Sequence, residues 1–483
     1  FVNQIVDPDE SIDEIVADPI EAVQQLDQIP HEKIPLPAAL FGGHRENSAG
    51  VNLPDRQVGQ SLYAEMAKLA SRQYDVKPVI DGNPVAGNKV VSTSPFDASD
   101  VVGEVAFANA DIALSAVSAA CAGYDAWEST PAVQRAAILE SAADLFETHL
   151  AEFCALCIRE AGKTLPDAIA EVREAVDFLR YYAAEARRLF AEPTVLPGPT
   201  GEHNVHGLRG RGVFVCVSPW NFPLAIFTGQ VVAALAAGNT VIAKPAEQTS
   251  VVAFRACELL WRAGVPATAL QFLPGDGGTA AAPAIRDPRV AGVAFTGSTE
   301  TAMIINQTLA ARDGSIGVLI AETGGQNAMI VDSSALPEQV VQDAVMSGFN
   351  SAGQRCSALC VQRDIAPRGI ELLKGAMDEL NIGDPADLKT DVGPVIDDAA
   401  RAILERHVER MGARQRILHQ WELPNETDAG GFFPPTLVEI DSLGVLKREG
   451  FGPIVHVYAF DGPDLSKLIE EINSTGYGLT FGV

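Results

Sequence analysis

The chain has 483 residues, of which 47% are hydrophobic and 20% charged, so it is long enough to form two or three globular domains. Its 63 acidic and 35 basic residues give a formal net charge of -28, which argues against nucleic acid and anionic membrane surfaces as partners because their phosphates would repel the chain. No apolar run reaches the roughly 18 residues that predict a membrane span.

The seven cysteines form an odd set, and most lie in apolar or helical stretches, which favours free thiols in a reducing compartment, the cytoplasm. Cys154 and Cys157 have the spacing of a metal or redox pair. No second pair or histidine cluster completes a tetrahedral site, so we expect two thiols on a helix and no metal centre.

Residues 1–60 are acidic and interrupted by prolines, which predicts an arm or linker with one short amphipathic helix. No signal peptide is expected, because no basic region followed by an apolar one occurs at the start, and the start at Phe1 suggests a fragment. From Ala110 to about Ala186, alanine-rich segments with helical spacing predict packing helices, with Gly162 as a C-terminal stop.

Residues 196–212 are rich in glycine and contain two prolines, which predicts a protruding hairpin. Its histidines, His203 and His206, have ligand-like spacing but lack carboxylate or thiolate partners, so we expect them to be solvated. From Gly212 onward, short β-branched runs alternate with helical segments. This alternation predicts an α/β fold with a parallel sheet and crossover helices.

Ligands of doubly wound folds bind beyond the carboxyl ends of the parallel strands. The segments that follow the predicted strands are therefore the candidate sites. They are SPWNFP (218–223), AKPAEQ (243–248), LPGDGG (273–278), FTGSTE (295–300) and ETGGQN (322–327). The dinucleotide fingerprint G-x-G-x-x-G is missing from these turns, so that motif does not itself predict a nucleotide site.

SPWNFP, KPAE, FTGST and ETGGQN, taken with GQRCSA (353–358) and EGFGP (449–453), resemble the aldehyde dehydrogenase superfamily in order and spacing. The resemblance implies a Rossmann-like NAD-binding domain and an α/β catalytic domain. The segments REAVDFLRYYA, FNSAGQRCSAL, LKGAMDEL, FVNQIVD and GVNLPDR are similar to the dehydrogenase half of the bifunctional proline utilization A family. That similarity implies oxidation of L-glutamate γ-semialdehyde, the open form of Δ1-pyrroline-5-carboxylate, to L-glutamate. It also implies an upstream proline dehydrogenase domain in the full-length protein.

The resemblance also divides the chain. After the arm at residues 1–60, we expect an NAD-binding domain at 61–195 and 213–321. Residues 196–212 become an oligomerisation hairpin, so a homo-oligomer is expected, and 322–483 become a catalytic domain. The family continues beyond Val483 through a loop that anchors the substrate carboxylate and a strand of the oligomer interface, so the catalytic domain is expected to be incomplete.

Oxidation of an aldehyde needs a nucleophile that turns the carbonyl carbon into a hydride donor, and a thiolate does so by forming a thiohemiacetal. Cys356 suits this role because it follows a short polar turn instead of lying in an apolar run. The resemblance assigns Asn221 as an oxyanion donor, together with the Cys356 amide. It also assigns Glu322, 34 residues before Cys356, as the base that activates water for thioester hydrolysis.

For the cofactor, the resemblance implies NAD. Lys244 and Glu247 match residues that hold the adenosine ribose, and a carboxylate there disfavours a 2′-phosphate. The other positions implied to bind the cofactor are Trp220, Gly275, Gly297, Ser298, Glu449 and Phe451. Ser357 matches a serine that binds the substrate carboxylate. Phe178 is a candidate for the aliphatic part of the pocket, with plain packing as its alternative.

Three functions remain open at this point. One is an active glutamate-semialdehyde dehydrogenase, and another is an aldehyde dehydrogenase for a different substrate such as succinate semialdehyde. The third is a non-catalytic NAD-binding or structural remnant. The joint presence of Asn221, Glu322 and Cys356 argues against the remnant, because a decayed site is expected to have lost at least one of them.

Overall fold

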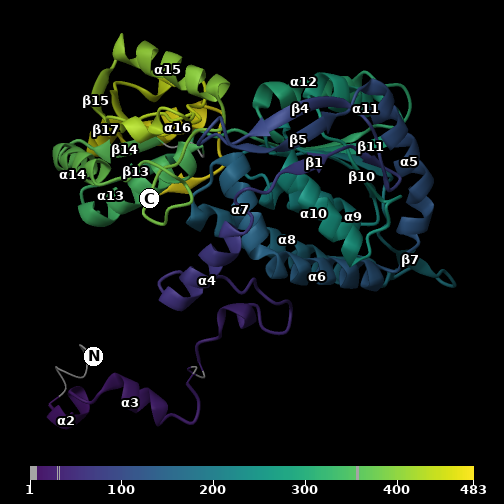
Figure 1. Ribbon diagram of the computed structural model, residues 1–483, viewed down its shortest axis with the longest axis horizontal. Coiled ribbons are helices and arrows are strands. Elements are labelled where there is room, and N and C mark those ends of the chain that lie inside the picture. The colour runs from purple at the N-terminus through teal and green to yellow at the C-terminus, as the bar shows by residue number, and fades with distance from the viewer. Residues whose placement is uncertain (1–7, 30, 32, 355–357) are drawn as a thin grey trace. The chain divides into compact units, whose positions relative to one another are not determined.

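The computed structural model describes residues 8–29, 31, 33–354 and 358–483 (Figure 1). The chain divides into two compact units, residues 1–49 and residues 50–483. The first unit contains α2 (Ile12–Ile15) and α3 (Pro19–Gln24), where the sequence predicted one short helix. Two helices form because each has its own N-cap: Ser11 accepts from the Glu14 amide and Asp18 from the Ile20 amide.

The second unit begins earlier than the predicted arm ends, at residue 50 instead of 61. The reason is α4 (Arg56–Ala67), whose N-terminus is capped by Asp55. Its residues Leu62 and Met66 are buried in the large core, so the helix belongs to the body of this unit.

A seven-stranded sheet forms the centre of the first half of this unit, in the order β12-β11-β8-β9-β10-β2-β3. The strands from β8 to β12 are parallel, as predicted. Two short strands extend the sheet in antiparallel fashion, which the sequence pattern did not predict. The strand bounds are β2 (Val79–Ile80), β3 (Asn83–Pro84), β8 (Val213–Val217), β9 (Thr240–Lys244), β10 (Leu270–Phe272), β11 (Val290–Gly297) and β12 (Val318–Thr323).

Helices cover both faces of this sheet (Figure 1). The side chains of β8 alternate between two cores: Phe214 and Cys216 pack with α6, α8, α9 and α10, whereas Val213, Val215 and Val217 pack with α5, α11 and α12. Burial on both faces explains the continuous apolar runs. The helix bounds are α5 (Ala110–Glu128), α6 (Ala132–Thr148), α7 (Leu150–Ala161), α8 (Leu165–Phe190), α9 (Ala225–Ala236), α10 (Ser250–Ala263), α11 (Ala282–Arg286) and α12 (Thr299–Ala310).

The second half is built on a six-stranded sheet, in the order β15-β16-β17-β14-β13-β18, with its own hydrophobic core. β15 is antiparallel to its neighbour and the other pairs are parallel. Its elements are β13 (Ala328–Val331), α13 (Pro337–Phe349), β14 (Ala358–Gln362), α14 (Ala366–Asp378), α15 (Asp398–Gly412), β15 (Arg416–Gln420), β16 (Thr436–Ile440), β17 (Ile454–Phe460), α16 (Leu465–Ser474) and β18 (Phe481–Gly482).

The glycine-rich excursion forms a two-stranded antiparallel hairpin, β6 (Thr194–Leu196) with β7 (Asn204–His206). His203 and His206 are exposed on it, and no group of side chains in the described ranges is arranged to hold a metal ion. The role of the hairpin in assembly stays a prediction. A separate three-stranded sheet joins β1 (Tyr74–Val76), β5 (Val101–Phe107) and β4 (Asn88–Thr93).

Cys154 and Cys157 lie buried on α7 as free thiols, which confirms the packing interpretation. Burial raises the pKa of the Cys154, Cys216 and Cys360 thiols to about 12, so they remain protonated near neutral pH. Among the helices in the described part of the chain, none combines the length and apolarity needed to cross a membrane.

Candidate active site

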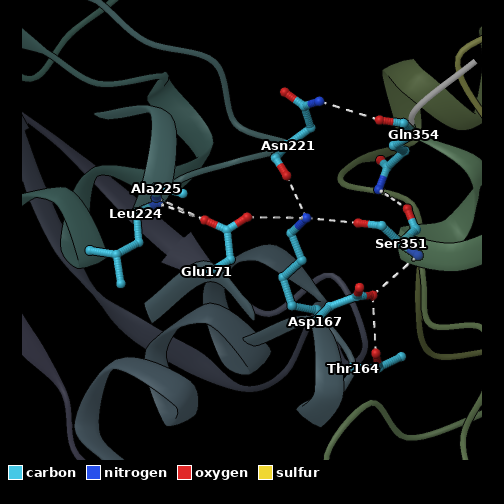
Figure 2. Close-up of polar contacts among 9 residues, drawn as sticks. Thr164, Asp167, Glu171, Asn221, Leu224, Ala225, Ser351 and Gln354 are labelled. Carbon is cyan, nitrogen blue, oxygen red and sulfur yellow. Dashed lines mark hydrogen bonds and ion pairs between the residues drawn. The ribbon is translucent and has the colours of Figure 1, made fainter. Parts of the chain in front are cut away.

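Asn221 lies in the turn between β8 and α9, beside the segment that leads to the predicted nucleophile. The side-chain amide of Asn221 donates to the main-chain oxygen of Gln354, with 3.3 Å between nitrogen and oxygen (Figure 2). Gln354 is two residues before Cys356 in the sequence. Cys356 and Ser357 themselves lie outside the described residues, so their predicted roles stay predictions.

The segment after α13 has an unusual backbone. Ser351, Ala352 and Gly353 have φ values of 55°, 54° and 65°, all in the left-handed region. Each non-glycine residue in this region costs about 1–2 kcal/mol. A Cβ on Gly353 would lie 2.3 Å from the main-chain carbon of Gly452, so only glycine fits. The close approach to Gly452 shows that this segment packs against the EGFGP motif. Backbone strain of this kind is characteristic of functional sites.

A cleft of about 810 Å³ opens beside the Asn221 turn. Seven of the predicted site residues line this cleft. They are Trp220, Asn221, Gly297, Ser298, Glu322, Glu449 and Phe451. Residues at the carboxyl ends of three strands, β8, β11 and β12, and residues of the EGFGP segment therefore meet in one concave surface, as expected for the carboxyl edge of a parallel sheet.

Trp220 and Phe451 meet edge to face in this cleft, with 5.4 Å between their ring centroids. Trp220 follows β8 of the seven-stranded sheet, and Phe451 precedes β17 of the six-stranded sheet. The aromatic pair therefore joins the two halves of the unit. A planar ligand ring bound here would find aromatic surfaces contributed by both halves.

Glu449 lies close to the turn after β12. A Cβ on Gly324 would lie only 1.9 Å from a carboxylate oxygen of Glu449, so the glycine makes room for this side chain. Burial raises the pKa of Glu449 to about 7, although a hydrogen bond from the Gly325 backbone acts in the opposite direction. The carboxylate is thus half-buried in the cleft wall and available to accept hydrogen bonds from hydroxyl groups.

Glu322 lies in β12, where it pairs in register with Thr296 of β11. Its side chain is exposed, and both residues line the cleft. The sequence placed Glu322 just after a buried strand. In the structure β12 continues through Thr323, at the edge of the sheet, and an exposed carboxylate at this edge has access to water without a large desolvation cost.

The remaining predicted cofactor positions follow the neighbouring strands. The ammonium of Lys244, at the end of β9, is buried and lies 3.0 Å from a carboxylate oxygen of Glu247. Gly275 follows β10 with a φ of 151°, and a Cβ there would lie 2.9 Å from Ala280. Ser298 caps α12 by accepting from the Thr301 amide at 3.1 Å. This row of polar groups, glycines and one helix N-terminus suits a dinucleotide, because pyrophosphate binds favourably at helix N-termini.

Phe178 lies on α8, and its ring packs beside Gly229 of α9 and stacks with Tyr182 at a centroid distance of 6.0 Å. This position agrees with the packing alternative. Its contact with substrate stays a prediction.

Sequence reasoning missed Lys163, Asp167 and Glu171, which are buried beneath the Asn221 turn. Charged side chains in a helical pattern usually belong to a solvated face. The signal that was available is Gly162-Lys163-Thr164, a charged residue directly after a helix stop and between two strongly apolar helical segments.

Several curated proteins are similar to this chain. "Bifunctional protein PutA" of Klebsiella aerogenes is 46% identical over 500 residues, and the match covers 100% of this chain but 37% of that protein. The chain thus spans little more than a third of the PutA relatives. The "1-pyrroline-5-carboxylate dehydrogenase" of Geobacillus kaustophilus is 37% identical over 440 residues, which cover 88% of this chain and 83% of that enzyme.

Solved structures of proteins with the same names are also similar to this chain. A proline utilization A structure with proline bound in remote sites has a TM-score of 0.86 and 46% identity, and covers 100% of this chain and 46% of that one. A Thermus 1-pyrroline-5-carboxylate dehydrogenase with bound NAD has a TM-score of 0.85 and 29% identity, and covers 95% and 87%. The model of the aldehyde dehydrogenase family matches residues 84–483. The chain therefore belongs to the aldehyde dehydrogenase family.

Proposed function

We propose that the chain oxidises L-glutamate γ-semialdehyde, the open form of Δ1-pyrroline-5-carboxylate, to L-glutamate with NAD as the oxidant. The observation that carries the proposal is the Asn221 side chain, which is hydrogen-bonded to the segment leading to Cys356 in a cleft that also contains Glu322. The names of the relatives supply the substrate, because they include 1-pyrroline-5-carboxylate dehydrogenase.

The proposed chemistry uses three side chains. The thiolate of Cys356 attacks the aldehyde carbon, and the Asn221 amide stabilises the oxyanion of the thiohemiacetal by donating a hydrogen bond. NAD, when bound, accepts the hydride that leaves this carbon, and a thioester on Cys356 remains. Glu322 then takes a proton from water as the water attacks the thioester, which releases the carboxylic acid and regenerates the Cys356 thiolate.

The residues around the cleft fit NAD as the cofactor. We assign Lys244 and Glu247, which form an ion pair, to the adenosine ribose, and the amino-terminus of α12 at Ser298 to the pyrophosphate. Glu449 and Phe451 are assigned to the nicotinamide ribose and ring, with Trp220 beside them. Gly275 leaves space beside the adenosine end.

The substrate assignments rest on Ser357 for the α-carboxylate and on Phe178 for the aliphatic chain. We further propose that the enzyme acts in the cytoplasm and that the β6–β7 hairpin contributes to a homo-oligomer. A proline dehydrogenase domain attached to the same polypeptide would supply the substrate, in keeping with the bifunctional relatives.

The test follows NADH formation with pyrroline-5-carboxylate and with succinate semialdehyde, for the wild type and for Cys356→Ala. We expect turnover with pyrroline-5-carboxylate and its loss in the variant. Cys360→Ala is the matched control, because that thiol is buried and protonated, and it should retain activity. Preference for succinate semialdehyde would overturn the substrate assignment, and no turnover with either aldehyde would favour a non-catalytic remnant.

A further inference from the structure

Lys163 is a buried lysine that the proposed chemistry does not use. It follows Gly162, which ends α7 in the left-handed conformation, and its amide donates to the main-chain oxygen of Cys157 at 3.2 Å. This helix stop fixes the backbone from which the side chain extends. The side chain is only 2% exposed, so its ammonium depends on protein partners for its hydrogen bonds.

The ammonium of Lys163 contacts three different segments, and its partners Asn221, Ser351 and Glu171 are labelled in Figure 2. It donates to the main-chain oxygen of Asn221 and to the hydroxyl of Ser351, the latter at 2.7 Å. A carboxylate oxygen of Glu171 lies 3.6 Å away. An ammonium has three hydrogen-bond donors, and two of these contacts hold the turn of the oxyanion donor and the segment before the nucleophile.

Two buried carboxylates from α8 secure the same two segments. Glu171 accepts from the amides of Leu224 and Ala225 at 3.2 and 2.9 Å, and so holds the residues that follow the Asn221 turn. Asp167 accepts from the Ser351 amide at 3.1 Å. Ser351 is one of the residues with left-handed backbone, so its conformation is held from both its amide and its hydroxyl.

We infer that Lys163 is a positioning residue that fixes the Asn221 turn relative to the segment leading to Cys356. The inference rests on the proposed function for the roles of Asn221 and Cys356. Lys163 contacts a main-chain oxygen and a serine hydroxyl beneath the turn, so its effect is on the placement of the oxyanion donor.

The first measurement is the turnover of Lys163→Met, which keeps an unbranched apolar side chain and removes the ammonium with its donors. We expect kcat to fall about 100-fold, because misplacing a catalytic group by about 1 Å has an effect of this size. The Kd of NAD should stay within about twofold. Lys163→Arg should not restore kcat, because a planar guanidinium does not reproduce the contacts of a compact ammonium.

A double-mutant cycle with Asn221→Ala separates positioning from general stability. If Lys163 acts through the Asn221 turn, the kcat loss of the double variant is clearly smaller than the product of the two single losses. Arg135→Met is the matched control: this buried guanidinium also donates to main-chain oxygens, including that of Ala236 at 3.1 Å, but outside the cleft. It should leave kcat unchanged.

Amide hydrogen exchange provides a readout that needs no turnover. In Lys163→Met, peptides covering residues 219–225 and 350–354 should exchange faster, because Glu171, which accepts from the first segment, loses its cation and the Ser351 hydroxyl loses its donor. Peptides from the rest of the chain should exchange at the wild-type rate. Should Lys163→Met fail to fold, Ser351→Ala replaces it and should give the same local pattern with a smaller kcat loss.

Propanal serves as the aldehyde throughout, so the outcome does not depend on the natural substrate. A wild type that oxidises propanal but not pyrroline-5-carboxylate contradicts the proposed function and leaves this inference to be decided by the cycle. If the wild type oxidises neither, the exchange pattern decides it. The positioning role would be overturned by any of three results. These are a kcat loss in the double variant that equals the product of the two single losses, a wild-type kcat in Lys163→Met, and unchanged amide exchange in both peptides.

Discussion

The amino-termini of α9 and α10 are built alike but differ in one partner. At α9, Glu171 of α8 accepts from the amides of Leu224 and Ala225. At α10, Glu160 of α7 accepts from the amides of Val251 and Val252, both at 2.8 Å. A carboxylate at a helix N-terminus satisfies amides that have no partner within the helix and interacts favourably with the helix dipole.

The difference lies in the charge beside each carboxylate. Glu171 has the ammonium of Lys163 within 3.6 Å. Glu160 has the hydroxyl of Ser92 at 3.5 Å, and burial raises its pKa to about 8 despite its hydrogen bonds. The same capping arrangement thus occurs with a buried cation at the catalytic end and with a neutral partner at the adenosine end of the proposed cofactor site.

The comparison indicates that helix capping does not by itself require a lysine. The lysine is present where a second segment, 351–354, must be held beside the capped helix. Four substitutions or titrations test this interpretation, in order of decreasing expected effect.

Glu171→Gln should have the largest effect, because it leaves Lys163 as a buried cation without its carboxylate. Removing one partner of a buried pair typically lowers the free energy of unfolding by about 3–5 kcal/mol. We also expect a clear fall in kcat, measured by NADH formation, since the Asn221 turn loses support. Urea unfolding measures the stability change. A variant with wild-type kcat would break the link between this cap and the chemistry.

Glu160→Gln should lower the free energy of unfolding by about 1–3 kcal/mol at pH 4.5. The glutamine side chain has an NH2 group in place of one of the two oxygens that accept from the buried amides of Val251 and Val252. The pKa of Glu160 is raised in the folded state, so its stabilising contribution is fully present below pH 4.5 and is lost as pH rises toward about 8. The difference from wild type should therefore shrink over this range. Urea unfolding at pH 4.5, 6 and 8 checks it, and kcat should stay near the wild-type value.

Glu449 extends the comparison to a half-buried carboxylate assigned to bind a ligand. Its pKa is raised to about 7 by burial, and the ionised form accepts hydroxyl hydrogen bonds more strongly, by about 1 kcal/mol. The Kd of NAD should therefore fall about three- to fourfold between pH 6 and pH 8. Titration calorimetry measures it. The Kd of Glu449→Gln should be insensitive to pH, and an equal pH dependence in this variant would assign the titration to another group.

Ala352→Gly should have the smallest effect. Ala352 has a φ of 54°, which glycine adopts without strain, and this gain offsets the extra freedom of glycine in the unfolded chain. We expect a change within about 0.5 kcal/mol by urea unfolding. Ala175→Gly in the middle of α8 is the control and should cost about 1 kcal/mol or more. Equal losses at both sites would mean that the left-handed segment stores little strain.

Much of the fold was predictable because it follows from local periodicity. The β-branched runs predicted the buried strands β8 and β9. The helical spacing of apolar residues predicted helices α5 to α8. The short strands β2 and β3 were not predictable, because two residues each give no period and the pairing of β2 with β10 joins residues far apart in the sequence.

The candidate site was predicted through motifs, and seven of those residues line one cleft. What the motifs could not predict is the support beneath it. Lys163, Asp167 and Glu171 are spaced four residues apart in a helical pattern, which is also the pattern of a solvated face. Their burial depends on α9 and on residue 351, which are distant in the sequence. The left-handed backbone at Ser351 and Ala352 likewise has no local signal.

The contacts of Lys163 also bear on how quickly a refolding chain becomes active. They join residues that are 58 and 188 positions apart in the sequence, across both sheets. Contacts of such long range form late, because loop-closure entropy opposes them until most of the chain is in place. Helical circular dichroism should therefore recover earlier than dehydrogenase activity after dilution from urea, with a lag that reports the docking of one half of the unit onto the other.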